Sequence, residues 1–281
     1  MRYISVLLLL AFGPALHAAG LGQGDIACRA GREDNRPYKK KLWDGYEISL
    51  GPVPKALDYG CTAAIYNSAG KVVFRTTGFG VAFDEGLTGE DFDGDGKAKV
   101  VFQTDSAGGA HCCWTYNVVS LFPKPHHLFD VGAGAAVRFE KDEQGKMVIW
   151  ELTPGLAGYW DMANDHPYAE RVFRVREGKL VDFTPEFCSG MFAPGKKDYE
   201  QQKLMLTPEE LKRLSESPGK PDAGTASALL SRALQHVFCR QFDEALNDLN
   251  LWPEATRDDV KSDFAESIKN DYPEFAARLQ K

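Results

Sequence analysis

The sequence predicts a mainly β protein, with antiparallel sheets arranged as in a sandwich or a propeller, followed by an α-helical C-terminal layer. Two observations lead to this fold class. Up to residue 186, short β-forming segments follow one another closely, with turn residues and no helical period between them. Beyond Ala226 the spacing of apolar residues changes to that of one face of a helix. The length of 281 residues suits one large domain or two small ones.

Residues 1–19 have the composition of a secretory signal peptide. Arg2 precedes an apolar run over Val6–Phe12, and the small residues Ala18 and Ala19 offer a cleavage site. The run is too short to span a bilayer, and no later stretch reaches the roughly 18 apolar residues of a membrane helix. We therefore expect a periplasmic or secreted protein with no membrane insertion.

Residues 20–186 form the predicted β-rich domain. From residue 20 to residue 41 the sequence is polar with little periodicity, which indicates an irregular N-terminal arm. Tyr46–Leu50 alternates in polarity, and Thr62–Tyr66 and Val72–Arg75 flank a glycine-containing turn, as in a hairpin. Further strands are predicted over Phe79–Phe83, Lys99–Thr104, Thr115–Phe122, Ala136–Glu140, Met147–Leu152, Arg171–Arg176 and Lys179–Phe183.

Residues 187–281 form the predicted helical region. Thr207, Pro208 and Glu210 have the spacing of a helix start with a capping box. A flexible connector rich in small residues follows near residues 215–226. The next helix carries one apolar face, and two further helices precede a last turn at the C-terminus. The apolar positions of these helices are Ala226, Leu229, Leu230, Ala233, Leu234, Val237 and Phe238, then Ala245, Leu246 and Leu249, then Val260, Phe264 and Ile268.

The cysteines predict disulfide bonds, because their number is even and the chain is predicted to be exported. The six are Cys28, Cys61, Cys112, Cys113, Cys188 and Cys239. Six cysteines allow 15 pairings. We expect Cys28 to pair with Cys61 and Cys188 with Cys239, which leaves the adjacent cysteines bonded to each other or to nothing.

An acidic loop precedes the predicted strand at residue 99. Asp91, Asp93 and Asp95 alternate along it, with glycines between and after them. Carboxylates at alternate positions of such a loop can converge on one hard divalent cation, while backbone carbonyls complete the coordination. Here the carbonyl of Lys97 is placed to be a further ligand. The sequence therefore predicts a calcium site formed by these four residues.

This loop resembles the FG-GAP repeat of integrin-α-like propellers, which reads D-x-D-G-D-G-x-x-D before a strand. Gly78–Gly80 also resembles the start of a strand in that family, so the resemblance covers about residues 78–104. It implies a bound calcium ion and a propeller-like arrangement. The ninth position, however, is Lys99. Its ammonium either points away and leaves a weaker calcium site, or lies at the cation position and neutralises the aspartates itself.

A second segment, Ala107–Cys113, follows the same strand. It is similar to the S-G-G-A-H-C-C segment of an uncharacterised exported bacterial protein family. In that family the segment follows a G-D-G loop and a strand, and here the corresponding loop is Gly94–Gly96. The resemblance implies that the loop and the Gly-His-Cys-Cys corner form one unit.

Several interpretations of His111, Cys112 and Cys113 remain open. A disulfide that stiffens the corner is one. A thiolate nucleophile with His111 as its base is another, although it needs a reduced thiol in an oxidising compartment. A zinc site is disfavoured because neighbouring residues of a strand point to opposite faces. Farther along, Asp161 and His166 lie in a long aromatic loop, which is a pinned surface loop or a binding segment.

The sequence as a whole indicates an exported binding or structural module with a calcium-stabilised acidic loop, a protein or glycan partner and no catalytic activity. The formal net charge of −7 disfavours nucleic acid as a partner. The alternative is a periplasmic hydrolase or a thiol or redox enzyme that uses His111, Cys112 and Cys113, or Asp161 and His166.

Overall fold

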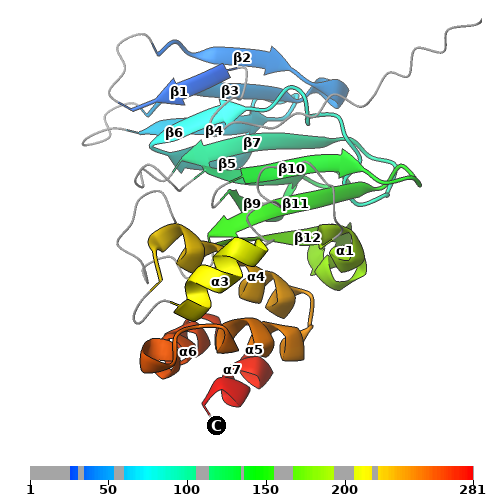
Figure 1. The fold of residues 1–281 in the computed structure, drawn as a ribbon. Helices are drawn as coiled ribbons and strands as arrows, with labels where there is room; N and C mark the ends of the chain where they lie inside the picture. Colours follow the sequence, from blue (N-terminus) through cyan, green and yellow to red (C-terminus); the bar gives the residue numbers. More distant parts are fainter. Residues whose placement is uncertain are drawn as a thin grey trace, which may run out of the picture.

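The structure is a computed structural model, which describes residues 26–30, 35–53, 60–105, 114–133, 136–154, 167–192, 206–216 and 221–280. These residues form three antiparallel sheets followed by helices (Figure 1), so the prediction of a mainly β fold with a helical C-terminal part is confirmed. The predicted signal peptide at residues 1–19 lies outside the described residues.

Each sheet is built from strands that are close in the sequence. The first holds β2 (Tyr38–Lys41), β3 (Glu47–Pro52), β4 (Cys61–Tyr66) and β5 (Val72–Gly78), with the short 3-10 helix η1 (Trp43–Gly45) between β2 and β3. The central sheet has the order β1 (Ile26–Arg29), β6 (Gly80–Phe83), β7 (Lys99–Asp105), β8 (Trp114–Ser120) and β9 (His126–Ala133). The third holds β10 (Ala136–Lys141), β11 (Met147–Pro154), β12 (Tyr168–Arg176) and β13 (Lys179–Asp182).

Three of these strands depart from the prediction. The segment expected to be an irregular arm contains β1 and β2. Pairing of β1 with β6, and of β2 with β3, holds these residues extended. The strand β9 was not predicted, since His126 and His127 at its start have no β-forming pattern, but its pairing with β8 holds it extended.

The central sheet is buried on both faces, and this organises the molecule into layers. Along β7, Val100 and Phe102 point into a core shared with the first sheet, while Val101 points into a core shared with the third sheet. The described sheets therefore stack face to face, as in a sandwich. The propeller-like arrangement is wrong for the described residues, because they form stacked layers and no closed propeller.

The helices lie on the outer side of the third sheet (Figure 1). They are α1 (Thr184–Met191), α3 (Pro208–Glu216), α4 (Ala223–Phe238), α5 (Phe242–Asn250), α6 (Glu254–Ile268) and α7 (Pro273–Leu279). The predicted capping box is present, because Glu210 N donates to Thr207 Oγ1 and Thr207 N donates to Glu210 Oε2. The connector is shorter than predicted, since α4 begins at Ala223 with Asp222 as its N-cap.

Polar side chains of α4 cover the part of β12 that β13 does not pair with. Gln235 accepts a hydrogen bond from Glu170 N (2.8 Å) and donates one to Glu170 O (3.0 Å). One helical turn earlier, Ser231 Oγ accepts from Tyr168 N (2.9 Å). At the start of α1, Thr184 Oγ1 accepts from Val172 N (2.9 Å). These contacts replace a missing strand and fix the position of α4 on the sheet.

Two disulfide bonds join elements that are distant in the sequence. Cys28 in β1 is bonded to Cys61 in β4, and Cys188 in α1 is bonded to Cys239 at the end of α4. Both predicted pairings are therefore confirmed. The first joins the central sheet to the first sheet, and the second joins α1 to α4 on the third sheet. Cys112 and Cys113 lie outside the described residues.

Gly78 ends β5 at the point where the chain passes from the first sheet to the central sheet. A Cβ atom at this position would lie 2.7 Å from Gly80 O and 2.8 Å from Asp105 O. The glycine is required by the close approach of these carbonyls.

Candidate functional site

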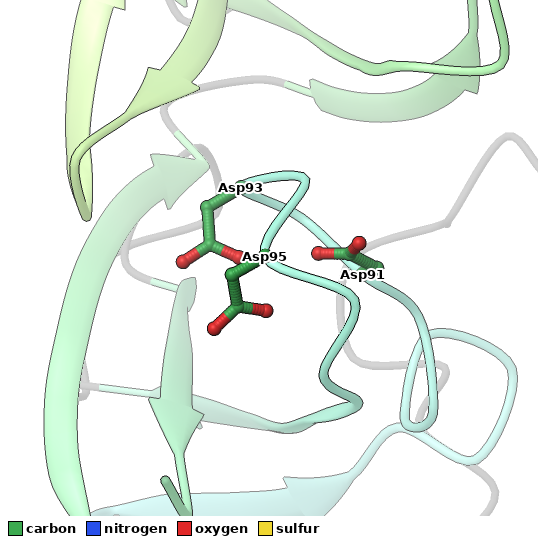
Figure 2. Close-up of side chains that lie close together, drawn as sticks. All are labelled: Asp91, Asp93 and Asp95. Atoms are coloured by element: carbon green, nitrogen blue, oxygen red, sulfur yellow. The ribbon is translucent and has the colours of Figure 1, made fainter. Parts of the chain in front are cut away.

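The acidic loop connects β6 to β7 and is shaped by its own backbone contacts. Gly94 and Gly96 have positive φ angles of 76°, which glycine adopts without strain. Asp91 holds the bend, because Oδ1 accepts from Gly94 N and Oδ2 accepts from Gly96 N, both at 2.8 Å. As a result Asp93 and Asp95 reach the inside of the bend, where Figure 2 shows their carboxylates next to each other.

The buried ring of Phe92 anchors this loop to the rest of the protein. Its ring packs edge to face against Phe129 and Phe139, with centroid distances of 5.9 and 5.8 Å. These two rings come from the central and third sheets. Phe92, which lies between Asp91 and Asp93 in the sequence, therefore attaches the loop to the core between these two sheets.

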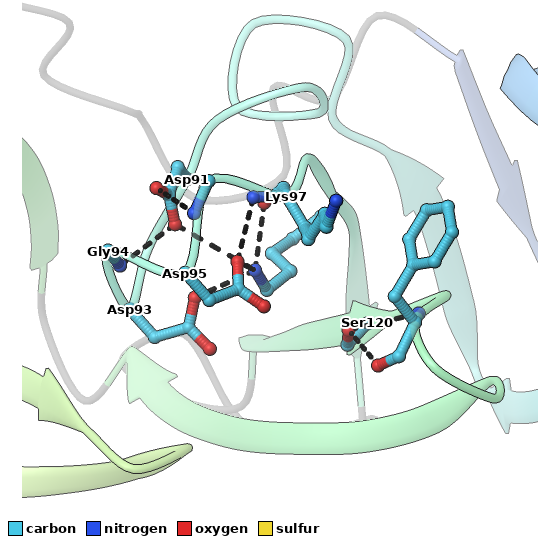
Figure 3. A network of polar contacts seen from close by, with 9 residues as sticks. Asp91, Asp93, Gly94, Asp95, Lys97 and Ser120 are labelled. Atoms are coloured by element: carbon cyan, nitrogen blue, oxygen red, sulfur yellow. Dashed lines mark hydrogen bonds and ion pairs between the residues drawn. The ribbon is translucent and has the colours of Figure 1, made fainter.

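The predicted donors converge, and the cation at their centre is the ammonium of Lys99. Its Nζ lies 2.6 Å from Asp95 Oδ1, 2.7 Å from Asp93 Oδ1 and 2.8 Å from the carbonyl oxygen of Lys97. Asp91 Oδ1 is farther away, at 3.8 Å. Figure 3 shows this network of contacts. Lys99 is fully buried, although it is the first residue of β7.

The charges of this group shift the pKa values in the directions expected of an ion pair. Burial by itself would lower the pKa of Lys99, but hydrogen bonds and attraction from Asp93 and Asp95 outweigh it and raise the pKa. For Asp95, burial acts to raise the pKa, and the bonds from Lys99 and from Lys97 N outweigh it and lower the pKa. Both groups are thus held in their charged forms.

This arrangement does not fit calcium. Calcium requires six to eight oxygen ligands at roughly 2.3–2.6 Å. Asp91, Asp93 and Asp95 have carboxylate oxygens within 4.8 Å of one another, a spacing that suits a metal ion. However, the ammonium of Lys99 lies between them. Of the two orientations expected for Lys99, the structure shows the one in which it neutralises the aspartates.

The expected unit of the acidic loop and the Gly-His-Cys-Cys corner includes residues that lie outside the described part of the chain. Lys99 begins β7 and Asp105 ends it, and seven extended residues span roughly 20 Å. Asp105 pairs with Trp114, the first residue of β8, so these two residues lie at the end of β7 opposite to the acidic loop. The expectation of a combined site stays a prediction. His111, Cys112 and Cys113, together with Asp161 and His166, lie outside the described residues.

A cleft of about 530 Å³ lies beside the acidic loop. Its walls come from three turns: the acidic loop, the β10–β11 turn and the β12–β13 turn. The lining includes charged side chains of both signs, namely Glu90, Asp91, Asp93, Lys141, Lys146, Arg174, Arg176 and Glu177. Two ion pairs support the walls, Lys141 with Glu90 (2.7 Å) and Arg174 with Asp142 (2.8 Å).

Sequence reasoning missed this cleft. The turns at Gln144–Gly145 and Glu177–Gly178 are visible in the sequence, and both glycines have positive φ angles. Nothing in the spacing of residues 91, 145 and 177 indicates that these turns meet. They do so because the central and third sheets stack on each other.

Comparison with known proteins adds little to this description. No protein-family model matches the chain. No curated protein matches it. Among solved structures, it is similar to a periplasmic inhibitor of I-type lysozyme from Aeromonas hydrophyla, with 15% sequence identity and a TM-score of 0.27, over 36% of this chain and 91% of that chain. At this TM-score the similarity carries no conclusion about fold or role.

The compartment of the protein follows from the disulfides. The two bonds between described cysteines favour an exported protein, because such bonds form and persist in oxidising compartments. Among the helices that the structure describes, none has the length and apolar character needed to cross a membrane.

Proposed function

We propose that the protein is an exported binding module that holds a segment of a partner protein in the cleft beside the acidic loop, without catalysing a reaction. The observation that carries this proposal is the cleft itself, formed by three turns from two sheets. Loops held on a rigid scaffold are the common place for binding residues. The proposal places the protein in the periplasm or in the extracellular medium.

The lining of the cleft favours a protein segment over a neutral glycan. Basic side chains such as Lys146 and Arg176 line it together with acidic ones such as Asp91 and Glu177. Mixed charges select a partner that carries the complementary pattern of charges. Neutral sugars usually stack on exposed aromatic rings, whereas the aromatic residue of this lining, Phe92, is buried in the core. A glycan is thus the less favoured of the two expected partners.

The walls of the cleft are already ordered, which favours binding. The Lys141–Glu90 ion pair joins the third sheet to the acidic loop, and Phe92 fixes the loop to the core. A partner that enters such a cleft does not have to order these loops, so less of the interaction energy is lost.

Site-specific photo-crosslinking tests the proposal. A photo-reactive residue is placed at Lys146 or Glu177 in the cleft, and at Lys71 in the β4–β5 turn as a control, and the protein is incubated with exported proteins of the source organism. We expect one discrete protein adduct from both cleft positions and none from Lys71. The Arg176→Glu variant, which reverses one charge of the lining, should lose the adduct. Equal adducts from all three positions, or an adduct unaffected by the charge reversal, would contradict the proposal, and an adduct with a glycan would identify the less favoured partner.

A further inference from the structure

We infer that Lys99 is a built-in cation that replaces calcium in the acidic loop, and that the loop is ordered without a metal. This inference is independent of the proposed binding role. It rests on the contacts of the ammonium with oxygens of the loop and on its burial.

The ammonium is held by three oxygens of the loop. It donates hydrogen bonds to Asp95 Oδ1 and to the carbonyl of Lys97, and it forms an ion pair with Asp93 Oδ1 at 2.7 Å. These are three of the four ligands expected for calcium. The loop therefore offers its oxygens to a cation in the manner of a metal site, with hydrogen bonds in place of coordination bonds.

The fourth expected ligand holds the bend. Both oxygens of Asp91 accept hydrogen bonds from the backbone, at Gly94 N and Gly96 N. Asp91 Oδ1 lies 3.8 Å from the ammonium, farther than the carboxylates of Asp93 and Asp95. Asp91 therefore shapes the loop around the cation, and the other two carboxylates contact the cation directly.

The backbone fixes Lys99 in this position. Lys99 N donates to Glu90 O at 3.0 Å, and Lys99 O accepts from Gly89 N at 2.9 Å. Its side chain is fully buried. A calcium ion would have to displace the ammonium from its two carboxylates into a packed interior, and a buried charge without its partners is strongly unfavourable.

The nature of residue 99 alone then decides which cation the loop uses. In the loop that this segment resembles, the corresponding position is an aspartate. We expect Lys99→Asp to remove the internal cation and to supply a further carboxylate, which converts the loop into a calcium site.

The experiment compares melting temperatures in EGTA and in about 5 mM calcium, a concentration that saturates weak extracellular sites. The wild-type protein should melt at the same temperature in both. Lys99→Asp should melt several degrees lower in EGTA and recover when calcium is added. Lys99→Met should melt about 5–10 °C lower than the wild type in EGTA, because the carboxylates lose their cation. Lys97→Met is the matched control: it removes the same charge from an exposed side chain and should change little.

A calcium-dependent rise in the melting temperature of the wild-type protein would overturn the inference. So would equal losses in Lys99→Met and Lys97→Met. A second measurement needs no variant: lysine acetylation followed by mass spectrometry should leave Lys99 unmodified both with and without calcium, while Lys97 reacts. If calcium makes Lys99 reactive, then the metal displaces the ammonium and the inference is wrong.

Discussion

Replacing Gln235 by methionine should separate α4 from β12. The two side chains are similar in length, so packing is nearly preserved, but methionine cannot donate a hydrogen bond and accepts one only weakly. Gln235 is fully buried and exchanges two hydrogen bonds with the backbone of Glu170. The variant therefore removes the two hydrogen bonds that join α4 to the backbone of β12 at Glu170.

The expected loss follows from those two bonds. A buried backbone group that loses its partner costs about 1–3 kcal/mol, and methionine recovers part of the loss because it is easier to bury than an amide. We expect the free energy of unfolding to fall by about 3 kcal/mol. For a chain of this size that corresponds to a decrease of about 6–12 °C in the melting temperature.

The assay is thermal unfolding together with amide hydrogen exchange. Protection should fall first at the amides of Tyr168 and Glu170 and along α4, because local opening exposes them. Gln144→Met in the exposed β10–β11 turn is the control, with an expected change below about 0.5 kcal/mol. If Gln235→Met loses no more stability than the control, then the hydrogen bonds to β12 do not hold α4 in place.

Three further predictions concern other parts of the molecule. Replacing both Cys188 and Cys239 by serine opens a bond between residues 51 apart and should cost about 4 kcal/mol in chemical denaturation, whereas an unchanged midpoint would show that the bond adds no stability. Burial raises the pKa of Glu151 from 4.5 to about 6, so the folded state holds the extra proton between these values and stability falls as the pH rises through them. Glu151→Gln should therefore stabilise the protein by up to about 2 kcal/mol at pH 7 and have no effect at pH 4, and a loss at pH 7 would refute this reasoning. Gly78→Ala should cost about 1–3 kcal/mol because of its contacts with two carbonyl oxygens, while Gly86→Ala, whose Cβ would meet only Asp84 Oδ1 at an ordinary contact distance of 3.6 Å, should cost less; equal losses would show that the crossing between sheets tolerates a side chain.

The fold class was predictable because it depends on local periodicity. Alternation over residues such as Tyr46–Leu50, and the helical spacing that begins at Ala226, reflect which side of each element is buried. The strands β1, β2 and β9 were missed, since their extended conformation comes from pairing with partners and not from their own residues. Both disulfide pairings between described cysteines were predicted correctly.

For the candidate site, the sequence by itself determined the donors, because Asp91, Asp93, Asp95 and the carbonyl of Lys97 are close together along the chain and glycines bend the loop between them. Only the tertiary structure decided which cation they meet. The position of Lys99 depends on the pairing of β7, and its side chain is fully buried at the start of that strand. The same stacking of sheets brings together the three turns of the cleft. Contacts between residues far apart in the sequence depend on how the layers pack, and local patterns do not record that packing.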